Sequence, residues 1–310
     1  MALGARFAQA TASSMSLTSQ IEKPAMSSRD SANGPSRTVR LAPSQTIRLA
    51  WALFWRPAAA MKMPAWTSSS VNLSIAANAS SISGSFRRSI PWSSERRLAG
   101  EPIAYLTGRK AFHGLELHID ARVLDPRADT ETLVDWALEL LPADAPRRVL
   151  DLGTGSGAIA LAIARQRPAA RVAAVDASAD ALAVATANAR RLGLSLDLRH
   201  GHWFGPVVGE TFDLVISNPP YIAVDDAHLP SLTHEPRQAL VSGADGLDDI
   251  RRIVAAAPAH LAPGGWLLLE HGWGQAAAVR ALLGDAGFAD IHSRRDLAGI
   301  ERGSGGYCPA

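Results

Sequence analysis

The sequence has little of what stabilises secreted or membrane-spanning proteins. It contains a single cysteine, Cys308, which excludes an intrachain disulfide framework and is typical of a reducing compartment. No apolar run reaches the roughly 18 residues that a membrane-spanning helix needs, and the N-terminus lacks the order of charge, apolar core and small residues of a signal peptide. The formal net charge of +2 gives no support to general polyanion binding. We therefore expect a cytoplasmic protein with no membrane partner.

Residues 1–95 differ in composition from the rest of the chain. They are rich in Ser, Ala, Arg and Pro and show weak periodicity, and before Glu95 they contain only two acidic residues, Glu22 and Asp30. Such a stretch fits a disordered basic arm, an organellar targeting segment, or the product of a shifted reading frame that does not belong to the natural protein. We predict an atypical N-terminal region over 1–95, a linker hairpin and helix over 96–142, and the main domain over 143–310.

Strands and helices alternate through the second half of the sequence. Strands are predicted at 147–153, 171–177, 195–201, 211–218, 264–272 and 289–296, and helices at 156–166, 179–193, 245–261 and 275–287. Upstream, alternating apolar positions over 111–124 predict a hairpin, and residues 129–141 predict a helix capped by Asp129 or Thr130. This order favours the α/β class, with a mostly parallel sheet covered on both faces. Ligands of such sheets bind beyond the C-terminal ends of the strands.

A glycine-dense loop, Gly153-Thr154-Gly155-Ser156-Gly157, joins the first of these strands to the following helix. Glycines permit a tight turn and close approach of the backbone to a ligand. The spacing GxGxG differs from the GxGxxG of dinucleotide sites and suits a ligand without phosphates, such as S-adenosylmethionine. Asp151, which precedes the loop, is then expected near the amino-acid end of that ligand. A tight turn without any ligand is the alternative interpretation.

Two further positions at the same sheet edge suit the rest of that ligand. Asp176 ends a predicted strand, where a carboxylate can accept hydrogen bonds from both ribose hydroxyls or, alternatively, cap the next helix. Trp203 follows the next strand and can wall the adenine or pack in the core. His200 and His202 lack a third ligand at a recognised spacing, so we predict no metal site.

The tetrapeptide Asn218-Pro219-Pro220-Tyr221 directly follows the apolar run FDLVIS. The prolines stiffen the backbone and donate no hydrogen bonds, while their carbonyls and the Asn218 side-chain oxygen remain free as acceptors. Such acceptors beside an aromatic ring suit a flat amide or amino group. With the glycine loop, this arrangement predicts methyl transfer to a planar nitrogen, held by Asn218 and the Pro219 carbonyl; a structural role alone is the alternative.

These motifs resemble the HemK/PrmC family of protein-(glutamine-N5) methyltransferases. The resemblance runs from about residue 96 to 302, and the matching stretches are GEPIAYLTGRKAFHGLEL, VLDPRADTETLV, VLDLGTGSGAIALAIA, FDLVISNPPYI, HEPRQAL and GGWLLLEHGW. It implies an enzyme whose class I, Rossmann-like methyltransferase domain has a seven-stranded sheet and is preceded by a small N-terminal region. The domain over 143–310 is then expected to be the S-adenosylmethionine-dependent methyltransferase domain.

The resemblance also implies a role for individual residues. It implies that S-adenosyl-L-methionine is bound by Gly153, Thr154, Gly155, Ser156, Gly157, Asp176, Trp203 and Asn218. It implies that the catalytic and substrate-binding residues, which hold the glutamine amide of the GGQ motif in peptide chain release factors, are Asn218, Pro219, Pro220 and Tyr221. We expect a monomer whose partner is that GGQ loop, with no direct nucleic-acid partner.

Two departures from the family pattern carry their own expectations. His202 stands where the family often has Asp, in the expected cofactor pocket. The stretch GSGGYCPA after Arg302 predicts a short or frayed last strand.

Two other functions stay open from the sequence alone. An Asn-Pro-Pro-Tyr motif also marks adenine-N6 methyltransferases of nucleic acid, which need a recognition region and a means of extruding the base. Residues 1–95 are basic but contain no recognisable recognition fold. An inactive product that retains cofactor affinity is the other alternative.

Overall fold

The structure is a computed structural model that describes residues 94–309. The interpretations of residues 1–95 therefore concern positions that lie almost entirely outside the described residues, and the domain boundaries at 95 and 142 stay predictions. The helices are α2 (Ser94–Leu98), α3 (Ile103–Thr107), α4 (Glu131–Leu140), α5 (Ala158–Gln166), α6 (Ala179–Leu192), α7 (Asp248–Ala256) and α8 (Ala276–Asp285). The strands are β1 (Arg109–Phe112), β2 (Leu115–His118), β3 (Arg148–Leu152), β4 (Arg171–Asp176), β5 (Asp197–His200), β6 (Phe212–Ser217), β7 (Leu261–Glu270), β8 (Ala289–Arg295) and β9 (Glu301–Tyr307).

One sheet of seven strands organises this part of the chain, in the order β5-β4-β3-β6-β7-β9-β8. Neighbouring strands from β5 to β7 are parallel, whereas β9 runs antiparallel to both β7 and β8. The chain winds outward in both directions from β3, so β3 and β6 lie side by side at the point where the strand order reverses. This confirms the predicted α/β class with a seven-stranded, Rossmann-like sheet, and ligands bind at such a reversal point in related sheets.

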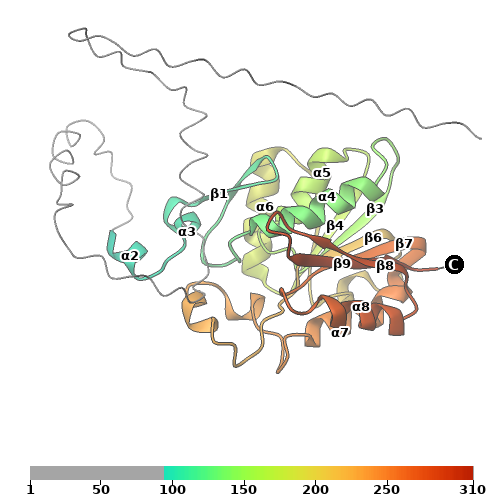
Figure 1. Cartoon of the computed structure of the whole chain (residues 1–310). Coiled ribbons are helices and arrows are strands. Elements are labelled where there is room, and N and C mark those ends of the chain that lie inside the picture. The colour runs from blue at the N-terminus through green and yellow to red at the C-terminus, as the bar shows by residue number, and fades with distance from the viewer. Residues whose placement is uncertain (1–93, 310) are drawn as a thin grey trace, which may run out of the picture. The chain divides into compact units, whose positions relative to one another are not determined.

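Helices cover both faces of the sheet, as Figure 1 shows, with α4, α5 and α6 on one side and α7 and α8 on the other. Alternate residues of one strand serve the two sides: Val149 of β3 belongs to the core under α4 to α6, and Leu150 to the core under α7 and α8. Both side chains are fully buried. Continuous apolar strands are required in this arrangement because neither face meets water.

The segment before the sheet contains the predicted hairpin. β1 and β2 pair antiparallel with Phe112 opposite Leu115, and the turn between them is formed by His113 and Gly114, both with positive φ. Positive φ at both central positions is typical of the tightest hairpin turns.

The prediction of a short or frayed last strand was wrong. β9 spans Glu301–Tyr307 and pairs along its length with two neighbours, and its residues Gly303 to Gly306 are buried. A side chain at Gly305 would place its Cβ 2.6 Å from the Leu267 carbonyl oxygen and 3.1 Å from the Trp136 ring. The glycines therefore let β9 lie close to its neighbours under α4, instead of weakening it.

The predicted cap of the helix at 129–141 was also wrong. α4 begins at Glu131 after a single 3₁₀ turn, Ala128–Thr130, and no side chain caps it. Thr130 itself has helical φ and ψ angles of −65° and −22°, whereas a capping residue normally has extended ones. Its hydroxyl contacts Asn218 instead.

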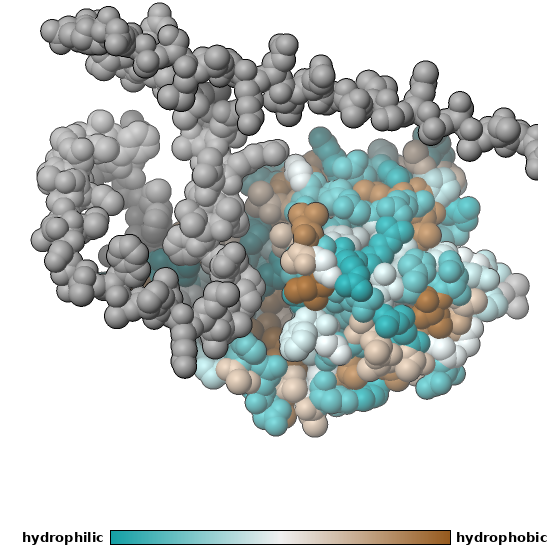
Figure 2. Space-filling model, viewed as in Figure 1, coloured by the Kyte–Doolittle hydropathy of each residue, from teal (hydrophilic) through white to brown (hydrophobic). Residues whose placement is uncertain are grey.

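Hydrophilic residues cover most of the face of the described domain drawn in Figure 2, and hydrophobic ones form small separate patches there. Among residues 94–309, no helix is long and apolar enough to cross a membrane.

Candidate functional site

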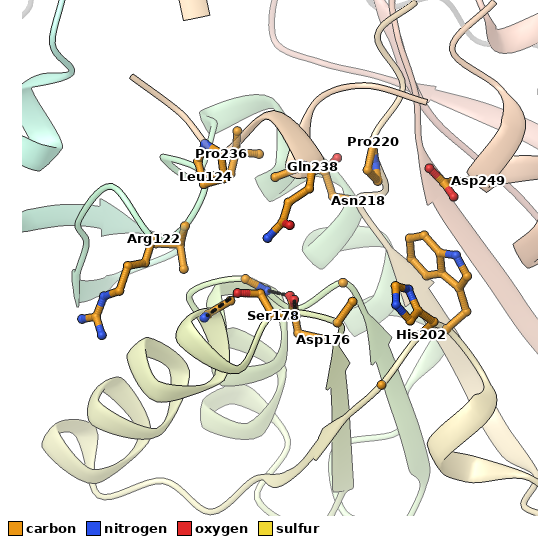
Figure 3. A pocket seen from close by; sticks show the side chains of 18 of the residues that line it. Arg122, Leu124, Asp176, Ser178, His202, Asn218, Pro220, Pro236, Gln238 and Asp249 are labelled. Atoms are coloured by element: carbon orange, nitrogen blue, oxygen red, sulfur yellow. Dashed lines mark hydrogen bonds between the residues drawn. The ribbon is translucent and has the colours of Figure 1, made fainter. Parts of the chain in front are cut away.

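A cavity of about 280 Å³ opens at the C-terminal ends of β3, β4 and β6. In Figure 3, Asp176 and Ser178 lie on one side of it and Asn218 and Gln238 on the other. His202 lies toward one end and Arg122 toward the other. Of the residues predicted from the sequence, those that line it are Gly153, Gly155, Asp176, Trp203, Asn218 and Pro220. The residues Thr154, Ser156, Gly157, Pro219 and Tyr221 do not.

The glycine loop bends because three of its residues have a left-handed backbone. Gly153, Gly155 and Gly157 have φ angles of +70°, +55° and +83°. The first two present their backbone to the cavity, whereas a Cβ at Gly157 would lie 3.1 Å from Leu161 and 3.3 Å from Ala185. Two glycines thus allow close approach of a ligand, and the third allows α5 to pack closely against α6.

Asp176 lies at the end of β4 and connects the two loops that border the cavity. Its carboxylate accepts hydrogen bonds from the N–H of Gly155 and from the N–H of Ser178, both at 2.8 Å. Burial raises the pKa of Asp176, although these two N–H groups act against the rise. The N-cap of α6 is Ser178, whose hydroxyl accepts from the Ala181 N–H at 3.2 Å. The carboxylate is therefore not used as a cap, and its remaining lone pairs can accept hydroxyl groups of a ligand.

The two aromatic residues after β5 have different surroundings. Trp203 has φ +46° and lines the cavity, and its ring lies 3.5 Å from where a Cβ on Gly153 would be. Phe204 is buried and stacks on His260, with ring centroids 4.5 Å apart. Core packing thus applies to Phe204, while Trp203 offers an apolar wall beside the glycine loop.

Asp151 lies beneath the glycine loop and does not reach the cavity. It is 1% exposed, and its Oδ2 accepts from the Thr154 hydroxyl at 2.6 Å and from the Ala160 N–H at 3.2 Å. Its Oδ1 is buried and has no hydrogen-bond partner among the described residues. Burial raises the pKa of Asp151 to about 7. The carboxyl therefore holds the loop together from below.

The Asp151 pKa predicts how stability depends on pH. Since the folded protein keeps a proton on Asp151 that the unfolded chain loses near pH 4, this group's contribution to stability is full below about pH 4 and is lost as the pH rises to about 7. We expect Asp151→Asn to flatten the decline of unfolding free energy in that window by roughly 1 kcal/mol per pH unit. Denaturant unfolding at several pH values measures the slope, with exposed Asp180→Asn as the control. Equal slopes in wild type and Asp151→Asn would contradict this role.

Asn218 is held in one orientation at the edge of the cavity. Its Nδ2 donates a hydrogen bond of 3.2 Å to the Thr130 hydroxyl oxygen. This leaves Oδ1 as the free acceptor, and Asn218 and Pro220 both line the cavity. Thr130 is 3% exposed and comes from the turn before α4, far from Asn218 in sequence.

Tyr221 does not line the cavity, and its hydroxyl reaches the end of β7. Its hydroxyl donates a hydrogen bond of 3.2 Å to Glu270 Oε1. Burial and the nearby Glu270 raise the pKa of Tyr221. The Tyr221 hydroxyl therefore has a buried polar contact, and the expected role of its ring at the substrate stays a prediction.

Sequence reasoning missed Thr130 and Glu270 as members of this site. Glu270 is the last residue of β7, and burial raises its pKa to about 7. The signal for Glu270 was available, because an acidic residue that ends a buried apolar strand at this edge is unusual. Thr130 gave no such signal, because a threonine before a helix is expected as a cap.

An ion-pair cluster joins two loops that border the cavity. Arg127 forms ion pairs with the buried Glu235 and, at 3.6 Å, with Asp125. The second Glu235 oxygen accepts from the Asp125 N–H at 3.3 Å, and Lys110 lies 3.0 Å from Asp125. These contacts hold the segment 122–127 against the segment 235–239, and both contribute lining residues.

No group of three or more His, Cys, Asp or Glu side chains within residues 94–309 is placed to hold a metal ion. The lining of the site instead offers backbone groups, the carboxylates of Asp176 and Asp249, the indole of Trp203, and the amides of Asn218 and Gln238.

Comparison with known proteins identifies the family. Residues 130–272 match the family described as Methyltransferase small domain. The chain is 50% identical over 218 residues to the release factor glutamine methyltransferase of Xylella fastidiosa (strain Temecula1). The matched region covers 69% of this chain and 79% of that protein. It is also 54% identical over 215 residues to the release factor glutamine methyltransferase of Bordetella pertussis. That matched region covers 68% of this chain and 80% of the relative.

A solved structure shares the fold at low sequence identity. It is described as the hMettl16 catalytic domain in complex with MAT2A 3'UTR hairpin 6, with a TM-score of 0.51 and 16% identity over 63% of this chain and 76% of that one. The matches at about half identity cover more than two thirds of each relative. The chain therefore belongs to the release factor glutamine methyltransferase family.

Proposed function

We propose that this protein transfers a methyl group from S-adenosyl-L-methionine to the side-chain amide nitrogen of the glutamine in the GGQ motif of peptide chain release factors. The observation that carries the proposal is the orientation of Asn218: its Nδ2 is bound to Thr130, so its Oδ1 is left to accept an N–H at the cavity. The family relatives named above act on this class of substrate.

The residues around the cavity fit the cofactor. A ligand without phosphates can lie against the backbone of Gly153 and Gly155, because neither residue has a side chain in its path. The Asp176 carboxylate supplies acceptors for ribose hydroxyls, and Trp203 supplies an apolar wall. When bound, S-adenosylmethionine supplies a methyl group attached to a positively charged sulfur. The amide nitrogen forms a bond to the methyl carbon as the carbon–sulfur bond breaks, and the sulfur is left as a neutral thioether.

The chain's own part in catalysis is to hold and polarise the amide. An amide nitrogen is a poor nucleophile because its lone pair is delocalised into the carbonyl. Pro219 does not itself line the cavity but stands between two residues that do, Asn218 and Pro220. Acceptance of the amide N–H groups by Asn218 Oδ1 and the Pro219 carbonyl raises electron density on nitrogen and aims it toward the methyl group. Such orientation supplies on the order of 7–11 kcal/mol of the barrier at best. After transfer, the nitrogen proton leaves to water.

The prolines make this clamp rigid. Pro219 and Pro220 fix two consecutive backbone φ angles and donate no hydrogen bonds that would compete for the acceptors. Ser217, just before the motif, is anchored to β3 through a 2.7 Å hydrogen bond from its hydroxyl to the Leu152 carbonyl. The acceptors are thus attached directly to the core of the sheet.

A methylation assay tests the proposal. The full chain is incubated with S-adenosylmethionine and a release factor, its variant with GGA in place of GGQ, or duplex DNA, and the products are analysed by mass spectrometry. We expect one added methyl group on the GGQ glutamine and none in the other two samples. Methylated adenine would establish the nucleic-acid alternative, and cofactor binding without any transfer would establish the inactive one.

A further inference from the structure

The end of β7 and the loop after it contact Tyr221, the last residue of the Asn-Pro-Pro-Tyr motif, at three points. The Tyr221 hydroxyl donates its hydrogen bond to Glu270. The Cδ2 atom of its ring lies 3.7 Å from where a Cβ on Gly272 would be. Its backbone carbonyl oxygen accepts a hydrogen bond of 3.0 Å from the side-chain Nε2 of Gln275. One short segment therefore holds the hydroxyl, the ring and the carbonyl of the residue that ends the motif.

The half-buried Gln275 side chain has partners on both ends of its amide. Its Nε2 donates a second hydrogen bond, of 3.2 Å, to the Asp245 carbonyl oxygen, and its Oε1 accepts from the Gly272 N–H at 2.8 Å. A reversed amide would set its oxygen against two carbonyl oxygens and its NH2 group against an N–H, so the partners fix the orientation. This one side chain therefore ties together three loops, which follow β6, precede α7 and follow β7.

Gln275 stands directly before α8, at the position where a side chain normally caps the helix. Ser, Thr, Asp and Asn are preferred there, because their short side chains reach the first free N–H groups of the helix. The Gln275 side chain makes no such bond to α8. Its amide instead reaches across to Tyr221. The local needs of the helix therefore do not explain a glutamine at this position, whereas the contact with the motif does.

The peptide group that follows the motif is held at both its oxygen and its nitrogen. The oxygen is the Tyr221 carbonyl, bound by Gln275, and the nitrogen belongs to Ile222, whose N–H donates to the Leu240 carbonyl at 2.9 Å. Gly246, with φ +77°, leaves room for this arrangement. A Cβ there would lie 2.2 Å from the Tyr221 oxygen and 2.8 Å from Gln275 Nε2, so a side chain would displace both groups.

We propose that Gln275 is a positioning residue for methyl transfer, which holds the Tyr221 carbonyl and thereby sets the direction of the Pro219 carbonyl. The proposal rests on the function proposed above, in which the Pro219 carbonyl accepts a substrate N–H. On the N-terminal side, the motif is anchored by the side-chain hydrogen bonds of Ser217 and Asn218. The two prolines fix their φ angles but leave their ψ angles to be set by the surroundings. A second anchor is therefore needed on the C-terminal side, and Gln275 supplies it.

Two substitutions of Gln275 in the full chain separate its hydrogen bonds. Gln275→Glu keeps the length and the acceptor for the Gly272 N–H, but at about pH 8 it is ionised and cannot donate to Tyr221. Gln275→Met keeps the length and removes both bonds. We expect each variant to lower kcat for release factor at least about tenfold, because a small displacement of a group that holds the substrate slows the reaction strongly.

Binding of S-adenosylhomocysteine is the second measurement. Its dissociation constant should change less than about twofold in both variants, because Gln275 does not line the cavity and the lost interaction serves the transition state. The matched control is Gln166→Glu, which makes the same change of charge on an exposed side chain at the end of α5. The control should keep the turnover and the affinity of the wild type.

Three outcomes would overturn this assignment. A loss of turnover in Gln275→Met but not in Gln275→Glu would mean that the bond to Gly272 matters and the bond to Tyr221 does not. A loss in Gln275→Glu alone would be an effect of the added charge. Equal losses of turnover and of cofactor affinity would mean that the whole site is distorted. Should one variant fail to fold, the other decides by the same two measurements. An inactive wild type would instead refute the proposed function, and this inference with it.

Discussion

Asn218→Ala should lower the rate of methyl transfer at least about 100-fold, the scale of losing one acceptor or donor aimed at a transition state. The substitution removes the oxygen that holds the substrate N–H and leaves the cavity otherwise intact. Asn218 contacts the fold through one hydrogen bond, to Thr130, so the protein should remain folded. Affinity for the cofactor should change only a few-fold, because the glycine loop, Asp176 and Trp203 are untouched.

Single-turnover methylation of release factor, with product quantified by mass spectrometry, measures this loss. Binding of S-adenosylhomocysteine by calorimetry gives the affinity in parallel. The matched control is Val224→Ala, which shortens an exposed side chain in the loop after the motif. Wild-type turnover by Asn218→Ala would remove Asn218 from the mechanism.

Asp176→Ala should weaken the binding of S-adenosylhomocysteine about 100-fold. Two effects combine here. The ribose hydroxyls lose a charged acceptor, worth about 1.5–3 kcal/mol. The N–H groups of Gly155 and Ser178 also lose the carboxylate to which they donate hydrogen bonds. Because the loop then loses one of its ties to β4 and keeps only the backbone hydrogen bonds of Gly153 and Thr154 to the Val175 carbonyl, the variant should also melt at a lower temperature in the absence of ligand.

Calorimetric titration of the variant measures this effect directly. Asp180→Ala removes an exposed carboxylate from the first turn of α6 and is the matched control, expected to change the dissociation constant by less than about twofold. An Asp176→Ala variant that binds as tightly as the control would mean that the ligand lies elsewhere.

The layered fold could be predicted from the sequence because its signals are local. Apolar strands that alternate with amphipathic helices predict a covered parallel sheet, and the glycine loop and Asn218 each follow a strand directly, which places both at the same edge. The positions of Asp176 and Trp203 at this edge could be predicted in the same way, because each lies at or just after the end of a strand. The cavity brings these residues together from the ends of four strands, β3, β4, β5 and β6.

The remaining features depend on contacts between distant segments. The Thr130 hydroxyl could not be assigned to Asn218 from the sequence, because 88 residues separate them and a threonine before a helix normally caps it. Tyr221 was expected at the substrate, and its hydroxyl donates a hydrogen bond to Glu270. Glu270 ends β7, which follows Tyr221 by many residues in the sequence. The run of glycines in β9 resembles a loop until the bulk of Trp136 above it is known.

A crystal structure of the chain with S-adenosylhomocysteine and a GGQ-containing release factor fragment would show directly how the substrate amide is held. We expect the glutamine amide to lie at the cavity with its N–H groups on Asn218 Oδ1 and the Pro219 carbonyl, and with its nitrogen facing the sulfur. A complex in which the Asn218 amide presents its NH2 group to the substrate, or in which the glutamine binds away from Asn218, would contradict it.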